Sequence, residues 1–239
     1  MKGEVQFRAD KLAVLIDADN TSAGVIEVLL REITKFGIAY VKRIYGDWTN
    51  PQMNTWKKVL NDFAIVPVQQ FGYTSGKNST DSALIIDAMD LLYTNEFDGF
   101  CIVSSDSDFT RLAHRIRQNG VAVYGFGRRQ TPRAFVASCD RFVHTELLGA
   151  AESPSDPDNS QQFELAAKSE EKSDLHELLK EAYEDVVRDD GIANVGAVGQ
   201  QLLKIDSSFD SRAYGHKKLG ELLKKTELFE VKGNDIRLK

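Results

Sequence analysis

The chain has 239 residues, of which 42% are hydrophobic and 28% charged, and its net charge is −6. No apolar run approaches the roughly 20 residues that span a bilayer, and the N-terminus lacks a signal-peptide pattern, so we expect neither a membrane-spanning helix nor a signal peptide. Only two cysteines occur, Cys101 and Cys139, without a metal-binding spacing, and we expect a cytoplasmic, reducing compartment.

The negative charge is concentrated in one short stretch. Residues 150–172 hold six acidic and two basic residues among Pro, Ser and Asp, which is typical of a linker. We therefore predict a first domain at 1–149, an acidic linker at 150–172 and a second domain at 173–239. The first domain has 17 acidic and 17 basic residues, so a local basic patch on it is compatible with the overall charge.

Strands and helices alternate through the first domain. The apolar run 12–16 predicts a buried parallel strand, because it lacks polar alternation. The remaining pattern predicts strands at 38–45, 65–69, 100–104, 121–126 and 141–145, and helices at 22–36, 51–63, 80–93, 109–118 and 131–138. This alternation indicates an α/β fold, a parallel sheet with helices on both faces.

Five aspartates fall at the same edge of the predicted sheet. Asp17 and Asp19 follow the first strand, Asp106 and Asp108 follow the fourth, and Asp81 opens a helix that runs back from that edge. In open α/β sheets the ligand sites lie beyond the carboxyl ends of the strands. Clustered carboxylates repel one another, so either their pKa values rise or a cation fills the gap. Oxygen ligands of this kind suit Mg²⁺ or Mn²⁺, and such a site can serve phosphoryl-transfer chemistry.

All of these aspartates except Asp17 also have a purely structural explanation. Asp19 or Asn20 is suited to cap the helix near Ser22, Asp106 or Asp108 to cap the next one, and Asp81 to interact favourably with a helix dipole. Asp17 comes too early in the chain to be a helix cap. The convergence of all of them favours a metal site, whereas Asp87 and Asp90 are expected on a solvated helix face.

Polar loops border the same edge. Residues 71–81 contain GKNST, which lacks the spacing of a nucleotide-binding phosphate loop. Within them, Lys77, Asn78, Ser79 and Thr80 are candidate contacts to a polymer backbone. After the fifth strand, Arg128, Arg129 and Arg133 suit phosphate oxygens, although basic runs are often simply solvated.

Other polar and aromatic residues complete this candidate substrate surface. Asn20 and Ser105, beside the first and fourth strands, are the further substrate-binding candidates. Tyr45, Trp48 and Tyr73 lie near strand ends, where aromatic rings either stack on bases or pack into the core.

Four motifs in order resemble the NYN domain of the PIN-like nuclease superfamily. They are LIDADN, KNSTD, VSSDSDF and YGFGRRQTPRAF, and the resemblance covers about residues 11–146. It implies a PIN-like fold and a metal-dependent ribonuclease. Asp17, Asp81, Asp106 and Asp108 match the acidic metal-site positions of this family, and Asn20 matches the polar position beside the first of them.

The second domain reads as three helices and a hairpin. Apolar spacing predicts helices at 174–187, 195–205 and 213–226, and Gly233-Asn234 predicts a hairpin turn, which together make a winged helix. The run IDSSFDSRAYGHKKLGELLKK resembles the OST-HTH, or LOTUS, domain, which implies binding of RNA or of a protein partner. Lys217, Lys218, Lys224 and Lys225 are candidate phosphate contacts.

These features predict a ribonuclease that uses Mg²⁺ or Mn²⁺ and carries an appended RNA- or protein-binding module. Replacing Asp17 or Asp106 with Asn is expected to abolish cleavage and to leave folding largely intact. Two alternatives stay open: an RNA-binding adaptor with a vestigial metal site, and a haloacid-dehalogenase-type phosphatase suggested by the pair Asp17 and Asp19. The oligomeric state does not follow from the sequence.

Overall fold

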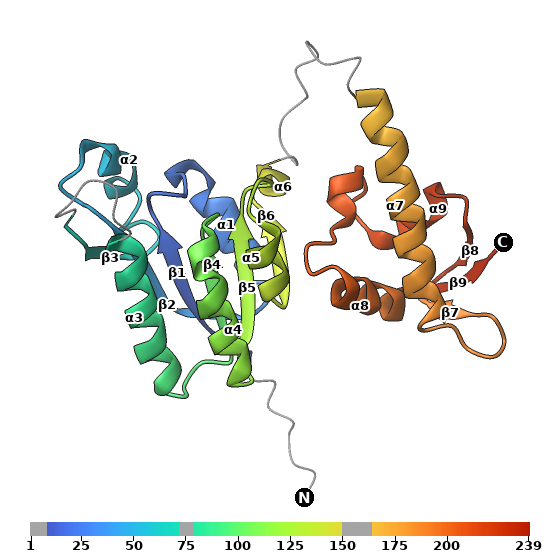
Figure 1. Cartoon of the computed structure of the whole chain (residues 1–239), viewed down its shortest axis with the longest axis horizontal. Coiled ribbons are helices and arrows are strands. Elements are labelled where there is room, and N and C mark those ends of the chain that lie inside the picture. The colour runs from blue at the N-terminus through green and yellow to red at the C-terminus, as the bar shows by residue number, and fades with distance from the viewer. Residues whose placement is uncertain (1–8, 72–78, 150–163) are drawn as a thin grey trace, which may run out of the picture. The chain divides into compact units, whose positions relative to one another are not determined.

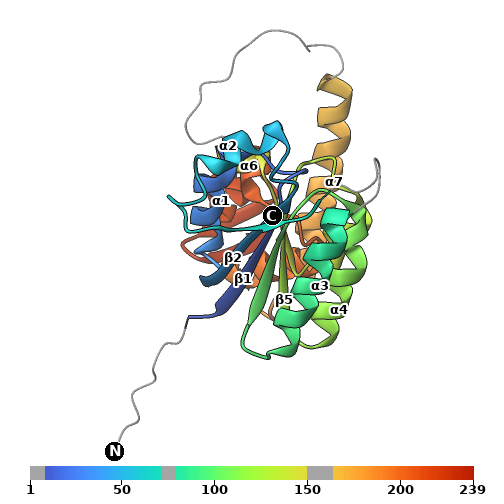
Figure 2. The same cartoon turned by 90° about the vertical axis from the view of Figure 1, so that its left-hand side faces the viewer.

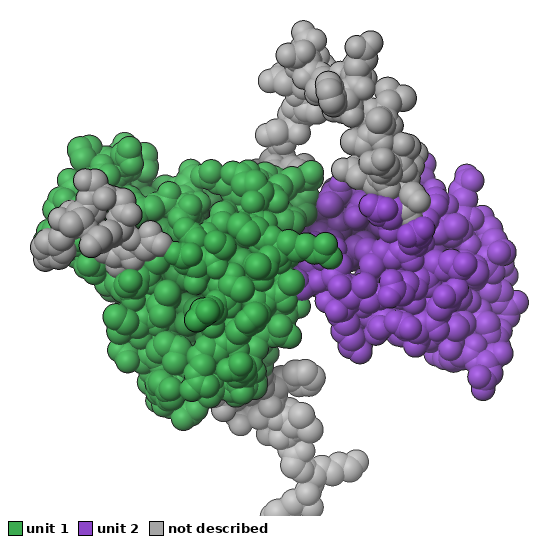
Figure 3. Space-filling view, viewed as in Figure 1, with its two compact units in different colours: residues 1–151 green, residues 152–239 purple. Residues whose placement is uncertain are grey.

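The chain folds as two units, residues 1–151 and residues 152–239 (Figure 3). The computed structural model describes residues 9–71, 79–149 and 164–239. Each unit has its own hydrophobic core, and the two are described separately below.

Six parallel strands form the sheet of the first unit (Figure 1). Their spatial order is β3-β2-β1-β4-β5-β6. From β1 the chain adds β2 and β3 on one side, and then returns so that β4 pairs with the other side of β1. The connections therefore diverge at the β1–β4 boundary, where α/β sheets have their binding crevice. The strands are β1 (Lys11–Asp17), β2 (Ile38–Gly46), β3 (Val66–Gln69), β4 (Gly99–Val103), β5 (Ala122–Gly127) and β6 (Arg141–His144).

Helices cover both faces of this sheet (Figure 2). Side chains alternate along β1, so Leu12, Val14 and Ile16 face one core cluster and Ala13 and Leu15 face the other. The first cluster includes residues of α1 (Ile26–Ile33) and α6 (Glu146–Gly149) and Trp56 of α2 (Asn54–Lys57). The second lies under α3 (Ser79–Tyr93), α4 (Thr110–Gln118) and α5 (Arg133–Ser138). The fold class predicted from the sequence is confirmed.

Two helices are shorter than their apolar spacing predicts. The 22–36 segment begins as the 3₁₀ turn η1 (Ala23–Val25), and its α-helical part ends at Ile33. The 51–63 segment holds η2 (Pro51–Met53) and only four α-helical residues, after which the chain continues in turns up to Ala64 with its φ of 50°. Val59, Leu60 and Phe63 still pack on the core, so burial produced a helix-like spacing without a continuous helix.

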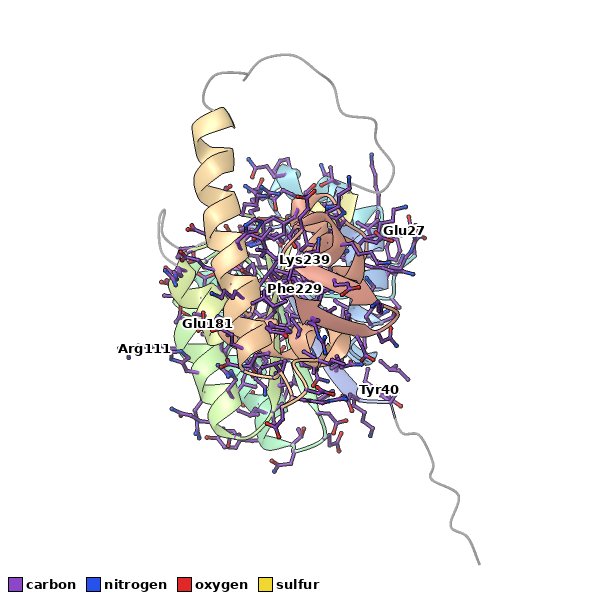
Figure 4. The ribbon with its side chains drawn as sticks, turned by 90° about the vertical axis from the view of Figure 1, so that its right-hand side faces the viewer. Glu27, Tyr40, Arg111, Glu181, Phe229 and Lys239 are labelled. Atoms are coloured by element: carbon purple, nitrogen blue, oxygen red, sulfur yellow. The ribbon has the colours of Figure 1, made fainter. Side chains whose placement is uncertain are left out.

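The second unit consists of three helices and a small antiparallel sheet. Its elements are α7 (Glu164–Glu184), β7 (Ala193–Asn194), α8 (Val195–Ile205), η4 (Ser211–Tyr214), α9 (Leu219–Lys225), β8 (Phe229–Lys232) and β9 (Asp235–Leu238). The strands pair in the order β7-β9-β8, and Phe229 of β8, labelled in Figure 4, is buried against Tyr183 of α7. This arrangement is consistent with a winged helix.

Three local details of the second unit differ from the sequence prediction or refine it. Helix α7 begins at Glu164, inside the stretch predicted as linker. The predicted 213–226 helix is interrupted, because Gly215 ends η4 in a left-handed conformation and α9 begins only at Leu219. The hairpin turn falls at Gly233, with a φ of 63°, as predicted. Within the described ranges, no helix is long and apolar enough to cross a membrane.

Candidate metal centre

The predicted aspartates lie at the β1–β4 boundary of the sheet. β1 and β4 are paired up to Ile16 and Val103, so Asp17, the last residue of β1, lies beside the point where the loop that carries Asp106 leaves β4. Asp17 is two residues beyond Leu15 and therefore belongs to the face that α3 and α4 cover. The first turn of α3, which holds Asp81, is at the same edge of that face. Three segments distant in sequence thus converge.

Three of the carboxylates form a compact acidic group. Asp81, Asp106 and Asp108 each offer an oxygen atom, and these oxygens all lie within 4.8 Å of one another. Burial, followed by the negative charges of Asp17, Asp106 and Asp108, raises the pKa of Asp81 to about 6 from its ordinary value of 3.8. Burial and these like charges thus disfavour the ionised form of Asp81, and a bound divalent cation would relieve the repulsion.

Asp17 has a different environment from these three. It is fully buried, and its Oδ1 accepts hydrogen bonds from the amides of Asp19 (3.0 Å) and Asn20 (3.3 Å). Its Oδ2 accepts from Asn20 Nδ2 at 2.6 Å and from Ser104 Oγ at 2.8 Å. Burial raises the pKa of Asp17, and the bonds from Asn20 and Ser104 oppose that rise. Since four donors use its acceptor capacity, its direct binding of a cation stays a prediction.

The helix-cap explanations apply to some of these residues and not to others. Ser22, rather than Asp19 or Asn20, caps η1, by accepting a hydrogen bond from the Gly24 amide at 3.3 Å. Asp106 is the cap of η3 (Ser107–Phe109), and its Oδ1 accepts from the Asp108 amide at 2.9 Å. This bond and the acidic group are compatible, because Asp106 has a second carboxylate oxygen.

Helix α3 is fixed to the sheet by a polar cluster beyond the acidic group. Asp87, less than two turns after Asp81, accepts hydrogen bonds from Arg43 and from the Tyr45 hydroxyl on β2. The prediction that Asp87 lies on a solvated face is therefore wrong, because its carboxylate is the partner that these two polar groups of β2 require. Tyr45 is fully buried, so its ring packs in the core and does not stack on bases.

The arginine-rich loop is attached to the same edge. The Arg128 amide donates to Ser105 Oγ at 2.9 Å, and the Arg129 amide donates to Glu146 Oε1 at 3.1 Å. A β-carbon on Gly127 would lie 2.5 Å from the Ser104 carbonyl oxygen, so only glycine fits where β5 approaches the acidic loop. The side chains of Arg128, Arg129 and Arg133 are exposed at this edge.

The residues predicted to contact the substrate differ in their surroundings. Asn20 is engaged with Asp17, Ser105 supports the arginine loop, and Lys77, Asn78 and Tyr73 lie outside the described residues. Sequence reasoning missed Ser104, which bonds Asp17, and the role of Thr80, whose hydroxyl donates to Asp19 Oδ2 at 3.2 Å. The only signal for Ser104 was its position at the end of a buried strand.

Matches to family models agree with the fold described above. No match to the chain was found among curated proteins. A crystal structure of a protein of unknown function from Vibrio parahaemolyticus is 20% identical and covers 59% of this chain and 96% of its own, with a TM-score of 0.49. The model of the OST-HTH/LOTUS domain matches residues 167–238, and that of the NYN domain matches residues 11–148. Because the NYN match covers more than half of the 239 residues, this chain belongs to the NYN domain family.

Proposed function

We propose that this chain is a metal-dependent ribonuclease whose second unit helps to bind the RNA. The observation that carries the proposal is the convergence of Asp81, Asp106 and Asp108, whose oxygens lie within 4.8 Å of one another in a domain of the PIN-like nuclease type. The OST-HTH/LOTUS match of the second unit supports a role of that unit in RNA binding.

The residues present fit a hard divalent cation. All three converging groups are carboxylates, which Mg²⁺ and Mn²⁺ prefer over sulfur or nitrogen ligands. Asp81, Asp106 and Asp108 would hold the ion, and Asp17 would either join them or support them through Asn20 and Ser104. A bound cation of this kind neutralises charge on a phosphoryl group and acidifies a water molecule.

The protein's own groups would position the substrate. Arg128, Arg129 and Arg133 are exposed beside the acidic group and suit the phosphate oxygens that flank the cleaved bond. Asn20, Ser105, Lys77 and Asn78 remain proposed contacts of the RNA backbone. We also propose the functional division of the chain into a nuclease domain at 1–149, a linker at 150–172 and a binding domain at 173–239.

In the second unit, the four lysines predicted to contact phosphates are all exposed. Lys217 and Lys218 precede α9, and Lys224 and Lys225 end it. We propose that these lysines bind RNA. The alternative, that they bind a protein partner, is distinguished by the assay below.

The phosphatase alternative is disfavoured by the environment of Asp17. A nucleophilic aspartate must reach its substrate, whereas Asp17 is fully buried and accepts four hydrogen bonds. The same bonds make Asp17→Asn an unsuitable test. The NH₂ group of an asparagine side chain would face the donors of Asn20 or Ser104, where the carboxylate now accepts hydrogen bonds. The expectation that this variant folds normally is therefore revised.

Asp106→Asn is the better test variant. Asn and Asp are comparable helix caps, so the bond to the Asp108 amide is retained while one charge of the acidic group is lost. The assay digests structured and unstructured RNA with Mn²⁺ or Mg²⁺, with EDTA added to parallel samples. Asp90→Asn, on the exposed side of α3, is the matched control.

We expect EDTA-sensitive cleavage by the unsubstituted and Asp90→Asn proteins and none by Asp106→Asn. RNA binding without EDTA-sensitive product would instead identify an adaptor. Cleavage by Asp106→Asn at the unsubstituted rate would refute the proposed site. Loss of RNA affinity on replacing Lys224 and Lys225 with Gln would support RNA as the ligand of the second unit, and unchanged affinity would point to a protein partner.

A further inference from the structure

One face of helix α4 carries a line of cationic side chains that starts at the acidic group. The helix, TRLAHRIRQ, contains three arginines and a histidine and no acidic residue. Leu112, Ala113 and Ile116 are buried in the core, so the opposite face is directed to solvent. Because α4 follows η3 without a break, this face continues from Asp108 itself.

The spacing of Asp108, Arg111 and Arg115 places them in one row. Residues three and then four positions apart lie on the same side of a helix, and all three are exposed. A rise of about 1.5 Å per residue separates Arg111 from Arg115 by about 6 Å along the axis. Figure 4 shows Arg111 extending outward from the ribbon of the first unit.

An exposed aromatic ring borders this row. Arg115 Nη2 donates a hydrogen bond to the Tyr93 hydroxyl at 3.1 Å. Tyr93 ends α3, and 62% of its surface is exposed. The contact holds a guanidinium and an aromatic ring next to each other, a combination that serves both phosphates and the faces of bases.

The two arginines have no acidic partner in the part of the chain that the structure describes. Among the described residues, Arg117 pairs with Asp140 at 2.9 Å, whereas neither Arg111 nor Arg115 forms an ion pair. Their charge is therefore not neutralised by described carboxylates, although an acidic group lies at the head of the helix. A polyanion that reaches this acidic group with one phosphate would meet the arginines with the next ones.

We propose that Arg111, Arg115 and Tyr93 form a track on which single-stranded RNA lies as it leaves the acidic group. The inference rests on the proposed function and deepens it, because it names the path of the strand and favours unpaired RNA, whose bases are free to stack on Tyr93. A duplex keeps its bases inside and would gain only the two phosphate contacts.

The test measures the binding of a labelled single-stranded 12-nucleotide RNA to the full chain at several KCl concentrations. Asp106→Asn serves as the parent protein, so that the RNA is not cut. Arg111→Gln/Arg115→Gln is compared with the control Arg31→Gln, whose exposed side chain on α1 belongs to the other face of the sheet. Melting of each variant verifies its fold.

Losing two phosphate contacts from single-stranded RNA should lower the slope of log affinity against log salt by about 1.4, which is about 25-fold in affinity at 0.1 M salt. Tyr93→Ala should weaken binding at least about fivefold, whereas Tyr93→Phe, which keeps the ring, should stay near the parent. Unchanged affinity and salt slope in the double variant would overturn the track, as would equal losses in Tyr93→Phe and Tyr93→Ala.

These results are distinguishable from a failure of the proposed function. If the unsubstituted chain cuts no RNA but the double variant shows the predicted drop in the slope of log affinity against log salt, the nuclease proposal fails and the track stands. If the chain cuts RNA and the double variant binds like its parent, the track fails alone.

Discussion

Removing the charge of Asp81 should stabilise the first unit, although Asp81 belongs to the proposed metal centre. Burial and the neighbouring charges of Asp17, Asp106 and Asp108 raise the pKa of this carboxyl from 3.8 to about 6. This difference means that the folded state destabilises the ionised carboxylate of Asp81 by about 3 kcal/mol relative to the unfolded chain. Because Asp81 is partly exposed, solvent screening reduces this to about 1.5 kcal/mol. The helix dipole favours the charge by about 0.5 kcal/mol, which leaves about 1 kcal/mol.

The sign of the pH dependence follows from proton binding. Between about pH 4 and pH 6 the folded chain keeps a proton on Asp81 that the unfolded chain has lost, so the free energy of unfolding falls as pH rises through this window. Asp81→Asn lacks this fall. The variant should match the unsubstituted protein near pH 4 and melt about 4 °C higher above pH 6 in EDTA.

Tryptophan fluorescence is the suitable probe for this melting experiment. The two tryptophans of the chain, Trp48 and Trp56, both belong to the first unit, so the second unit does not contribute. Asp90→Asn, an exposed carboxyl of the same helix, should show no such pH-dependent gain. An Asp81→Asn protein that melts at or below the unsubstituted temperature at pH 7.5 would refute the electrostatic reasoning.

Three further perturbations test separate parts of the structure. Asp87→Asn should lower the free energy of urea unfolding by about 2 kcal/mol, because the bonds from Arg43 and Tyr45 lose their charged acceptor; a change under 0.5 kcal/mol would contradict it. Gly127→Ala should cost roughly 1–3 kcal/mol by the same assay, since its β-carbon would meet a backbone oxygen, and a neutral effect would show that β5 can shift. Phe229→Ala should cost roughly 3–5 kcal/mol in the second unit, seen by circular dichroism, and leave the tryptophan transition unchanged; a shifted transition would show that the units unfold together.

The layered fold follows from patterns that burial enforces directly. Leu12–Ile16 is apolar at every position because helices cover both faces of β1, and such a run predicts a central parallel strand. The convergence of Asp81 with Asp106 and Asp108 was likewise predictable, since parallel strands place their carboxyl ends at one edge and the returning helix begins there.

The finer environment of the site depends on contacts that a sequence does not reveal. Asp17 and Asp106 look alike as residues after a strand, yet one is saturated by four donors and the other caps a 3₁₀ turn. Asp87 has the spacing of a solvated position on α3, and only its tertiary partners on β2 show otherwise. Hydrogen bonds between distant segments thus separate residues whose local sequences are equivalent.

Calorimetric titration with Mn²⁺ tests the central claim most directly, because it does not depend on the RNA substrate. The carboxylates of Asp81, Asp106 and Asp108 are close enough to share one ion. We expect Mn²⁺ to bind the unsubstituted and Asp90→Asn proteins with equal affinity, and to bind Asp106→Asn at least about tenfold more weakly, since one charged ligand is lost. Equal Mn²⁺ affinity in all three proteins would contradict a metal centre at these carboxylates.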